Sequence, residues 1–421
     1  GLEIDIQGGF HQAGNDNSLM EGVLAAANQP IPGSTTDGRE LTASVTMGAN
    51  TFDGRGNVTL FVNYENLNAI SQGDRVESGC AIGADDSEFS FRGIGCIGSG
   101  NFRLMGGPGG SFFQQADGEI VPFVSSPETT FNFGPDNFFQ RPIERFQIYS
   151  KGKYELTDDI ELFTDLSFTN VNSDAQIAPS ASFGTNFSIN CDNPFIQPDA
   201  NPGVALTEVF GCPEPGASVD VGGIQASHRN VEGDPRSTAL DNTTWRTLGG
   251  LRGTLFENYD FEVFGQFSRT QDKDISTNDL LIDNVQDGFF VIEGPDGNPV
   301  CRSGNPDCVP FNIFQRTPDG ESLVTAEAAN FVTGVGITTG ETQQVSFGGN
   351  IQTNLERFGF VSPFADSGMG ILFGWEYRKD ELDARPDQIS QRADGGFTGV
   401  GGPTLPTQGE VKVAEGFMEA Q

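Results

Sequence analysis

The chain has 421 residues, of which 36% are hydrophobic and 19% are charged, and its formal net charge is −35. An excess of carboxylates this large repels the phosphates of DNA and RNA, so we expect no nucleic-acid partner. No apolar run reaches the roughly 18 residues of a transmembrane helix, but a membrane-spanning strand stays possible because it exposes only alternate residues to lipid.

The N-terminal part predicts three strands and one short helix. Residues 2–7 alternate between apolar and polar side chains, as a strand with two different faces does. A helix is expected within residues 15–29, entered at Asn17 or Ser18. Two further strands are expected at 41–52 and 58–65, with a glycine-containing turn between them.

The clearest alternation lies in residues 145–171 and predicts a β-hairpin. Apolar residues such as Phe146 and Ile148 share one parity of the first arm, and mostly charged or polar residues share the other. The junction Thr157-Asp158-Asp159 is typical of a tight turn. Each arm has about ten residues, which suits a tilted strand across a bilayer, whereas strands of soluble proteins usually have about five or six.

The rest of the chain repeats this plan. Alternating segments at 245–256 and 261–270, at 345–355 and 371–377, and at 411–421 predict two more hairpins and a last strand. A second short helix is expected at 322–333. The regions 71–140, 174–242, 273–340 and 386–410 lose the alternation and are expected to be long irregular loops.

The connections are therefore of two kinds. Short turns are expected near residues 55, 158, 258 and 365, and a long connection follows each of the hairpins. Successive connections of an up-and-down sheet alternate between its two ends, so all the short turns should lie at one end. The sequence predicts an all-β chain, an antiparallel up-and-down transmembrane β-barrel segment of about ten strands with short periplasmic turns and long extracellular loops.

The cysteines follow the same division, because each of the three longest loops contains two of them. The simplest interpretation is three local disulfides, Cys80–Cys96, Cys191–Cys212 and Cys301–Cys308, although fifteen connectivities are possible in principle. Disulfides indicate an oxidising compartment, and each could stabilise its loop by about 2–4 kcal/mol. A metal site is not expected, because no pair has the C-x2-C spacing and only two histidines are present.

Residues 131–171 resemble a stretch of the barrels of TonB-dependent outer-membrane receptors. The matching features are Pro135, Asn137, Phe138, Phe139, Pro142, Arg145 and the hairpin that follows with its acidic turn. The resemblance implies a 22-stranded barrel with an N-terminal plug domain, energised through TonB. This chain has about ten expected strands and no recognisable plug, and it lacks an initial Met and a signal peptide. We therefore expect residues 1–421 to be an incomplete barrel, an internal piece of a longer protein.

The resemblance also implies a function and partners. Expected are a receptor in the outer membrane of a Gram-negative bacterium, with contacts to outer-membrane lipid. Its ligand would be a siderophore, cobalamin or an oligosaccharide, and the missing plug would connect it to the TonB-type complex. A passive porin and a secreted β-rich adhesin are the alternatives, a hydrolase is a remote one, and no cofactor is expected.

Candidate site residues come from strand parity and loop composition. Aromatic residues that could stack on a ligand are Phe112, Phe113, Phe138 and Phe139, although packing within the loops is the favoured interpretation. Polar residues expected to face the lumen are Glu3, Asp5, Glu65, Arg145, Lys151, Lys153, Glu161, Asp165, Arg246, Arg252 and Glu262. No catalytic arrangement is recognised. The acidic cluster Asp85–Glu88 could bind calcium, but it lacks the spacing of an EF-hand.

Overall fold

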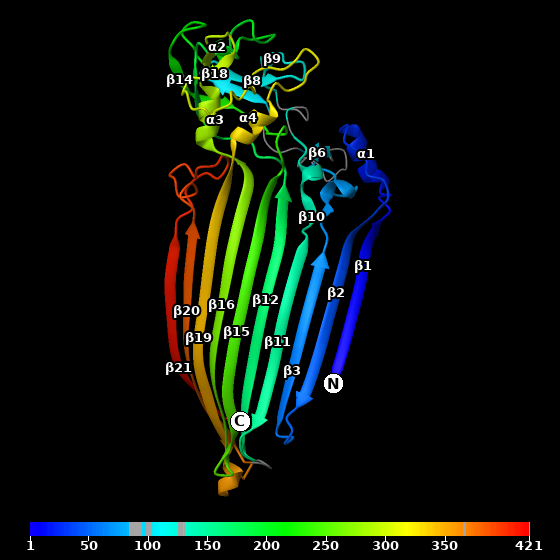
Figure 1. The fold of residues 1–421 in the computed structure, drawn as a ribbon, viewed down its shortest axis with the longest axis vertical. Helices are drawn as coiled ribbons and strands as arrows, with labels where there is room; N and C mark the ends of the chain where they lie inside the picture. The colour runs from blue at the N-terminus through cyan, green and yellow to red at the C-terminus, as the bar shows by residue number, and fades with distance from the viewer. Residues whose placement is uncertain are drawn as a thin grey trace.

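A computed structural model describes residues 1–83, 95–97, 103–124, 129, 131–361, 363–364 and 368–420. Within these residues, ten strands form one large antiparallel sheet, here called the wall (Figure 1). In their order across the sheet, they are β1 (Leu2–Ala13), β2 (Thr35–Asn50), β3 (Gly56–Leu67), β11 (Ile143–Glu155), β12 (Ile160–Ile177), β15 (Arg236–Leu255), β16 (Tyr259–Leu280), β19 (Thr333–Asn354), β20 (Gly370–Pro386) and β21 (Thr407–Ala420).

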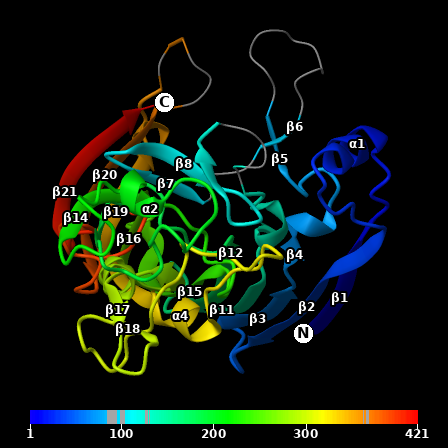
Figure 2. The same ribbon diagram turned by 90° about the horizontal axis from the view of Figure 1, so that it is seen from above.

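The wall confirms the predicted up-and-down arrangement, because its strand order follows the order along the chain and every neighbouring pair is antiparallel. Seen from above, the strands follow an arc whose ends are β1 and β21 (Figure 2). In the described part of the chain, these two strands pair on one side only. The sheet is therefore an open segment of a barrel wall.

The short connections lie together at the lower end of the wall in Figure 1, as predicted, and the long ones lie at the upper end. The turn between β11 and β12 spans only 156–159, and the turn between β15 and β16 spans 256–258. The turn between β19 and β20 contains the short 3-10 helix η5 (Leu355–Phe358). The predicted turn at 362–368 lies partly outside the described residues.

Several wall strands are longer than their alternation predicted. The strands β15, β16 and β19 extend about nine to twelve residues further toward the upper end than expected. There the sheet continues through backbone pairing, such as Ser237 opposite Thr277, while both faces carry many polar side chains. Apolar and polar residues alternate only where the two faces of a strand lie in different environments. The alternation therefore disappears where both faces are polar, even though the strand continues.

The regions 71–140, 174–242 and 273–340 were expected to be irregular, and that expectation is wrong. They contain β4 (Ile70–Ser71), η1 (Gln72–Asp74), β5 (Ala81–Gly83), β6 (Gly95–Ile97), β7 (Leu104–Gly107), β8 (Gly110–Gln114), β9 (Ile120–Pro122), η4 (Gly134–Asp136), β10 (Phe138–Gln140), β13 (Phe187–Asn190), α2 (Leu206–Val209), β14 (Asp220–Ala226), α3 (Ile282–Phe289), β17 (Val291–Glu293), β18 (Pro299–Cys301) and α4 (Ala326–Phe331). Most of this structure forms one folded unit, here called the cap, from segments 103–124, 178–235 and 281–332 (Figure 1).

The cap has its own hydrophobic core, to which all three segments contribute. A five-stranded sheet of order β13-β14-β7-β8-β9 joins the first two segments. Phe187 of the second segment packs edge-on against Phe289 of the third, at 5.2 Å between ring centroids. Gln114 of the first donates a hydrogen bond to the backbone oxygen of Phe314 of the third, at 2.7 Å. The three loops therefore fold as one body.

The two predicted helices are confirmed in place, with shorter bounds. Helix α1 (Ser18–Ala26) begins after Asn17, whose side chain accepts a hydrogen bond from the Met20 amide, as an N-cap does. Helix α4 begins after Thr325, which caps it in the same way through the amide of Ala328. No helix in the described part of the chain is long and apolar enough to cross a membrane.

Candidate functional site

One face of the wall carries an apolar band. Strand register places Ile148 opposite Val62 on one side and Phe168 on the other, and Phe168 opposite Trp245. Phe267 lies opposite Val345 in the same way. Phe347 on this face is 50% exposed, whereas its neighbour Ser346 on the other face is 5% exposed. The apolar side chains thus point outward to the surroundings of the sheet, and we call this side the outward face.

The opposite side, here called the inner face, carries a continuous chain of polar contacts. The Tyr149 hydroxyl donates to Asp165 at 2.8 Å, and the Arg246 guanidinium lies 3.9 Å from the same carboxylate. Arg246 donates to Gln266 at 2.7 Å, and the Gln266 amide donates to Gln344 at 2.7 Å. The chain continues from Gln344 to Asp380 at 2.8 Å and so runs from β11 to β20.

The residues expected to face the lumen all share this inner face in the register of the wall. Arg145 forms an ion pair with Glu65 at 2.9 Å, and Arg252 forms one with Glu161 at 2.6 Å. Such pairs fix the side chains of neighbouring strands relative to each other. The arrangement is a polar, hydrogen-bonded lining, which suits water or a polar ligand passing along it.

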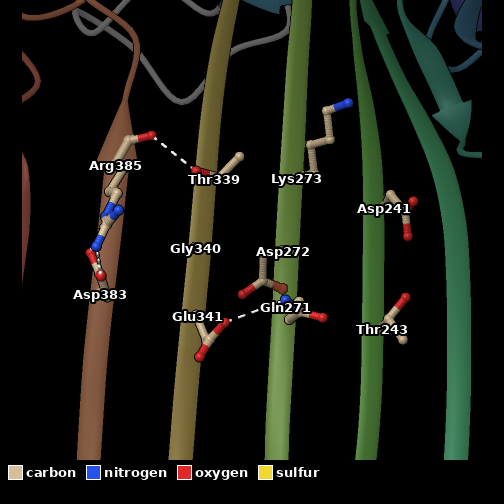
Figure 3. Close-up of a pocket in the computed structure, with 10 residues that line it drawn as sticks. All are labelled: Asp241, Thr243, Gln271, Asp272, Lys273, Thr339, Gly340, Glu341, Asp383 and Arg385. Carbon is tan, nitrogen blue, oxygen red and sulfur yellow. Dashed lines mark hydrogen bonds and ion pairs between the residues drawn. The ribbon is translucent and has the colours of Figure 1, made fainter.

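Beyond the apolar band, toward the cap, the outward face becomes polar. A groove of about 570 Å³ lies there. Its lining residues, drawn in Figure 3, are Asp241, Thr243, Gln271, Asp272, Lys273, Thr339, Gly340, Glu341, Asp383 and Arg385. Arg385 is paired with Asp383, and Gln271 donates to Glu341. Asp241 and Thr243 accept hydrogen bonds from Asn170 on the neighbouring strand. The groove is therefore a hydrogen-bonded polar rim above the band.

Two of the three predicted disulfides are confirmed, Cys191–Cys212 and Cys301–Cys308, each local to its loop. The first is buried in the cap, next to α2, and the second ties down the loop after β18. For the third pair, the backbone of Cys96 lies opposite Ile82 in the pairing of β5 with β6, but the Cys96 side chain lies outside the described residues. The acidic cluster Asp85–Glu88 lies outside them as well.

The aromatic candidates do not form one cluster. Phe112 is half-buried against the cap core, and Phe113 is buried at 6% exposure with the Arg103 guanidinium 5.2 Å from its ring centroid. Phe138 and Phe139 belong to β10, which pairs with β4 outside the cap sheet. Phe139 is 61% exposed and is the one of the four most open to a ligand. A ligand-binding role for these residues stays a prediction.

Sequence reasoning missed a buried cation in the cap. Arg229 lies between the rings of Phe131 and Phe183, at 4.9 and 5.0 Å from their centroids, and donates to the backbone oxygen of Pro179. Burial lowers the pKa of Arg229 to about 10, so the guanidinium stays charged at neutral pH. Its position in an irregular loop gave no periodic signal. Within the described residues, no three His, Cys, Asp or Glu side chains converge as metal ligands do.

A buried histidine–glutamate pair is expected to make the stability of the cap depend on pH. His228, 3% exposed, lies 2.9 Å from the Glu232 carboxylate. Burial opposes the charge on Glu232, but hydrogen bonding and the charge of His228 outweigh it and hold the pKa of this carboxyl below its usual value. The pair therefore stabilises the cap above the unfolded pKa of about 4.3 and loses that effect as the pH falls through the folded pKa.

We expect wild-type protein and the Glu232→Gln variant to differ in cap stability at pH 7 and to converge as the pH falls through the lowered pKa of the Glu232 carboxyl. Amide hydrogen exchange of segment 178–235 measures that difference across the pH range. A difference that stayed constant from neutral to acid pH would contradict the assignment.

No protein-family model and no curated protein matches the sequence. Among solved structures, it is similar to the ferric enterobactin receptor PfeA of Pseudomonas aeruginosa, with a TM-score of 0.41 and 9% identity over 100% of this chain and 37% of that one. It is also similar to the siderophore receptor PiuA of Acinetobacter baumannii, with a TM-score of 0.40 and 12% identity over 100% and 42% of the two chains.

A further match is the open form of the ferric-catecholate import receptor Fiu of E. coli K12, with a TM-score of 0.35 and 10% identity. It covers 99% of this chain and 46% of that one, so the chain spans less than half the length of these receptors. The ligands named for those receptors belong to those proteins.

Proposed function

We propose that the chain is part of the wall and extracellular cap of an outer-membrane receptor of a Gram-negative bacterium. In this proposal, the receptor takes up a small-molecule ligand of the siderophore, cobalamin or oligosaccharide class by TonB-dependent active transport. The observation that carries the proposal is the two-faced wall. Its outward apolar band is roughly seven to eleven residues tall from strand to strand, close to the height of a bilayer-spanning strand, and its inner face is a polar lining.

The cap supports a receptor over a passive pore. A unit with its own core, two disulfides and contributions from three loops presents a fixed surface at the end where ligands would arrive. Fixed loops favour selective binding, because less conformational entropy is lost when the ligand binds. The inner-face polar chain would then line the path of the ligand. The plug and the TonB-type complex would act on the whole protein, of which this chain is a part.

The proposal is tested by uptake into whole cells. The full-length protein is expressed in an iron-limited strain that lacks its own receptors, and accumulation of radiolabelled ferric siderophores, cobalamin and oligosaccharides is followed. We expect saturable accumulation of one ligand class that disappears in the same strain without TonB. Uptake that is linear in concentration and independent of TonB would instead establish a passive porin. A protein that purified from the medium without detergent would establish a secreted adhesin.

A further inference from the structure

The outward apolar band begins directly at the short turns. On β16, the outward positions from the turn upward are Tyr259, Phe261, Val263, Gly265 and Phe267, and the first charged one is Arg269. On β20, the corresponding positions run from Ile371 to Tyr377, and the first charged one is Lys379. In the described wall strands, no charged outward side chain lies between the band and the turns. The band has a polar rim on the cap side only.

The turns themselves carry large apolar side chains that touch little protein. Phe52, between β2 and β3, is fully exposed, with a relative accessibility of 115%. Phe256, between β15 and β16, is 85% exposed, and Phe360, between β19 and β20, is 68% exposed. Leu156, in the turn between β11 and β12, is 46% exposed. Four successive turns at one end of the wall thus present apolar tips.

One of these tips is also conformationally unfavourable. Phe256 and Glu257 have φ angles of +51° and +62°, and the Asn258 amide donates to the Leu255 oxygen at 3.2 Å. This is a type I′ turn, whose two central positions usually hold Asn, Asp or Gly. A phenylalanine there is strained and, in water, would also expose its ring. Within the described residues, no contact compensates for the backbone strain at Phe256 or for the exposure of its ring.

We propose that the turn end of the wall is seated in the bilayer, with Phe52, Phe256 and Phe360 inserted into the boundary between headgroups and acyl chains of the turn-side leaflet. This inference rests on the membrane placement in the proposed function. Continuity with the outward band favours lipid as the occupant, because on β16 and β20 the apolar outward rows lead to the turns without an intervening charged side chain. Beside the turn that carries Phe52, the outward Tyr154 donates a hydrogen bond to Asp53 at 2.8 Å. The neighbouring carboxylates of Asp53 and Glu257 hold the turns at the interface, since charges resist deeper insertion.

Fluorescence quenching tests the proposal in the full-length protein, folded in phosphatidylcholine vesicles with its native cysteines oxidised. Single cysteines placed by Phe52→Cys and Phe256→Cys carry an environment-sensitive label, and Asp319→Cys in the exposed part of the cap is the aqueous control. We expect nitroxide lipids to quench the two turn labels at least about threefold more than the control, and iodide to quench them less.

Quenching like that of the control would place the tips in water. Protection from iodide without nitroxide quenching would mean that a protein covers them. Either result overturns the proposal.

A pair of turn variants gives a second readout that does not depend on a label. Phe256→Asn and Glu257→Asn both place a favoured residue at a positive φ angle, but only the first removes a ring. We expect the urea midpoint for unfolding from vesicles to fall for Phe256→Asn and to stay or rise for Glu257→Asn. A rise for both variants would show that only strain was relieved and would overturn the proposal. If both readouts come out as expected but the protein takes up no ligand, the proposed function is contradicted and the placement of the turns in lipid is not.

Discussion

Replacing Val263 by arginine is expected to destabilise the protein in lipid vesicles by about 2–4 kcal/mol, the usual cost of a basic residue on the lipid face of a barrel near the bilayer midplane. Val263 lies midway along the outward positions of β16, opposite Leu251 on β15 and Gly349 on β19, and is 39% exposed. Equilibrium unfolding from vesicles in urea measures the effect directly. The amount of folded protein in the outer membrane should fall with it.

The matched control is Gln266→Arg on the same strand. Gln266 belongs to the inner face, between Arg246 and Gln344, where a polar lining surrounds it. This substitution breaks two hydrogen bonds at about 1 kcal/mol each but meets no lipid, so its cost should be smaller than that of Val263→Arg. If both substitutions cost the same, or if Gln266→Arg cost more, the assignment of the two faces would be wrong.

Replacing Phe289 by alanine is expected to destabilise the whole cap by about 3–5 kcal/mol. Phe289 is completely buried and has ring neighbours in two segments, Phe187 at 5.2 Å and Phe314 at 5.0 Å. The cavity left by the ring would lie where the second and third segments meet. Limited proteolysis of the folded protein should then cleave within 103–124 and 178–235 as readily as within 281–332, the segment that carries the substitution.

Phe139→Ala is the control for this experiment, since it removes the same ring from a position that is 61% exposed. It should leave the protease pattern of the cap unchanged. New cleavage confined to 281–332 in Phe289→Ala would mean that the three segments fold independently and would contradict the description of the cap as one body.

The sequence predicted the wall because its strands separate two environments. Around Phe146 and Lys151, for instance, apolar and charged residues alternate strictly enough to reveal which face each belongs to. The upper ends of β15, β16 and β19 escaped prediction for the same reason. Residues such as Asp241 and Lys273 lie on the outward face but above the apolar band, where alternation no longer distinguishes the two sides.

The cap could not be predicted in the same way, because its pieces are too short to show a period. Strand β7 has four residues, LMGG, and finds its partners in β8 and in β14, which lies more than a hundred residues further along the chain. Local features were easier to predict. The disulfides Cys191–Cys212 and Cys301–Cys308 join residues 21 and 7 positions apart, and the N-cap residues Asn17 and Thr325 act on the next turn of the chain.

The candidate ligand residues show the limit of composition as a guide. Phe112 and Phe113 are adjacent in sequence, as Phe138 and Phe139 are, and nothing in the sequence distinguishes the two pairs. The structure separates them, because Phe113 is buried beside Arg103 while Phe139 remains exposed. Exposure depends on which distant segments fold against a residue, and a single sequence does not carry that information.

The long polar part of the strands has an electrostatic consequence. From Arg269 to its end at Leu280, β16 continues for about 12 residues beyond the band, or ~40 Å along the strand at about 3.3 Å per residue. At a tilt of about 45°, this lifts the cap ~28 Å from the hydrocarbon, several times the Debye length of about 8 Å at physiological ionic strength. A charged molecule meeting the cap would therefore sense the potential of the protein itself, with that of the lipid headgroups almost entirely screened.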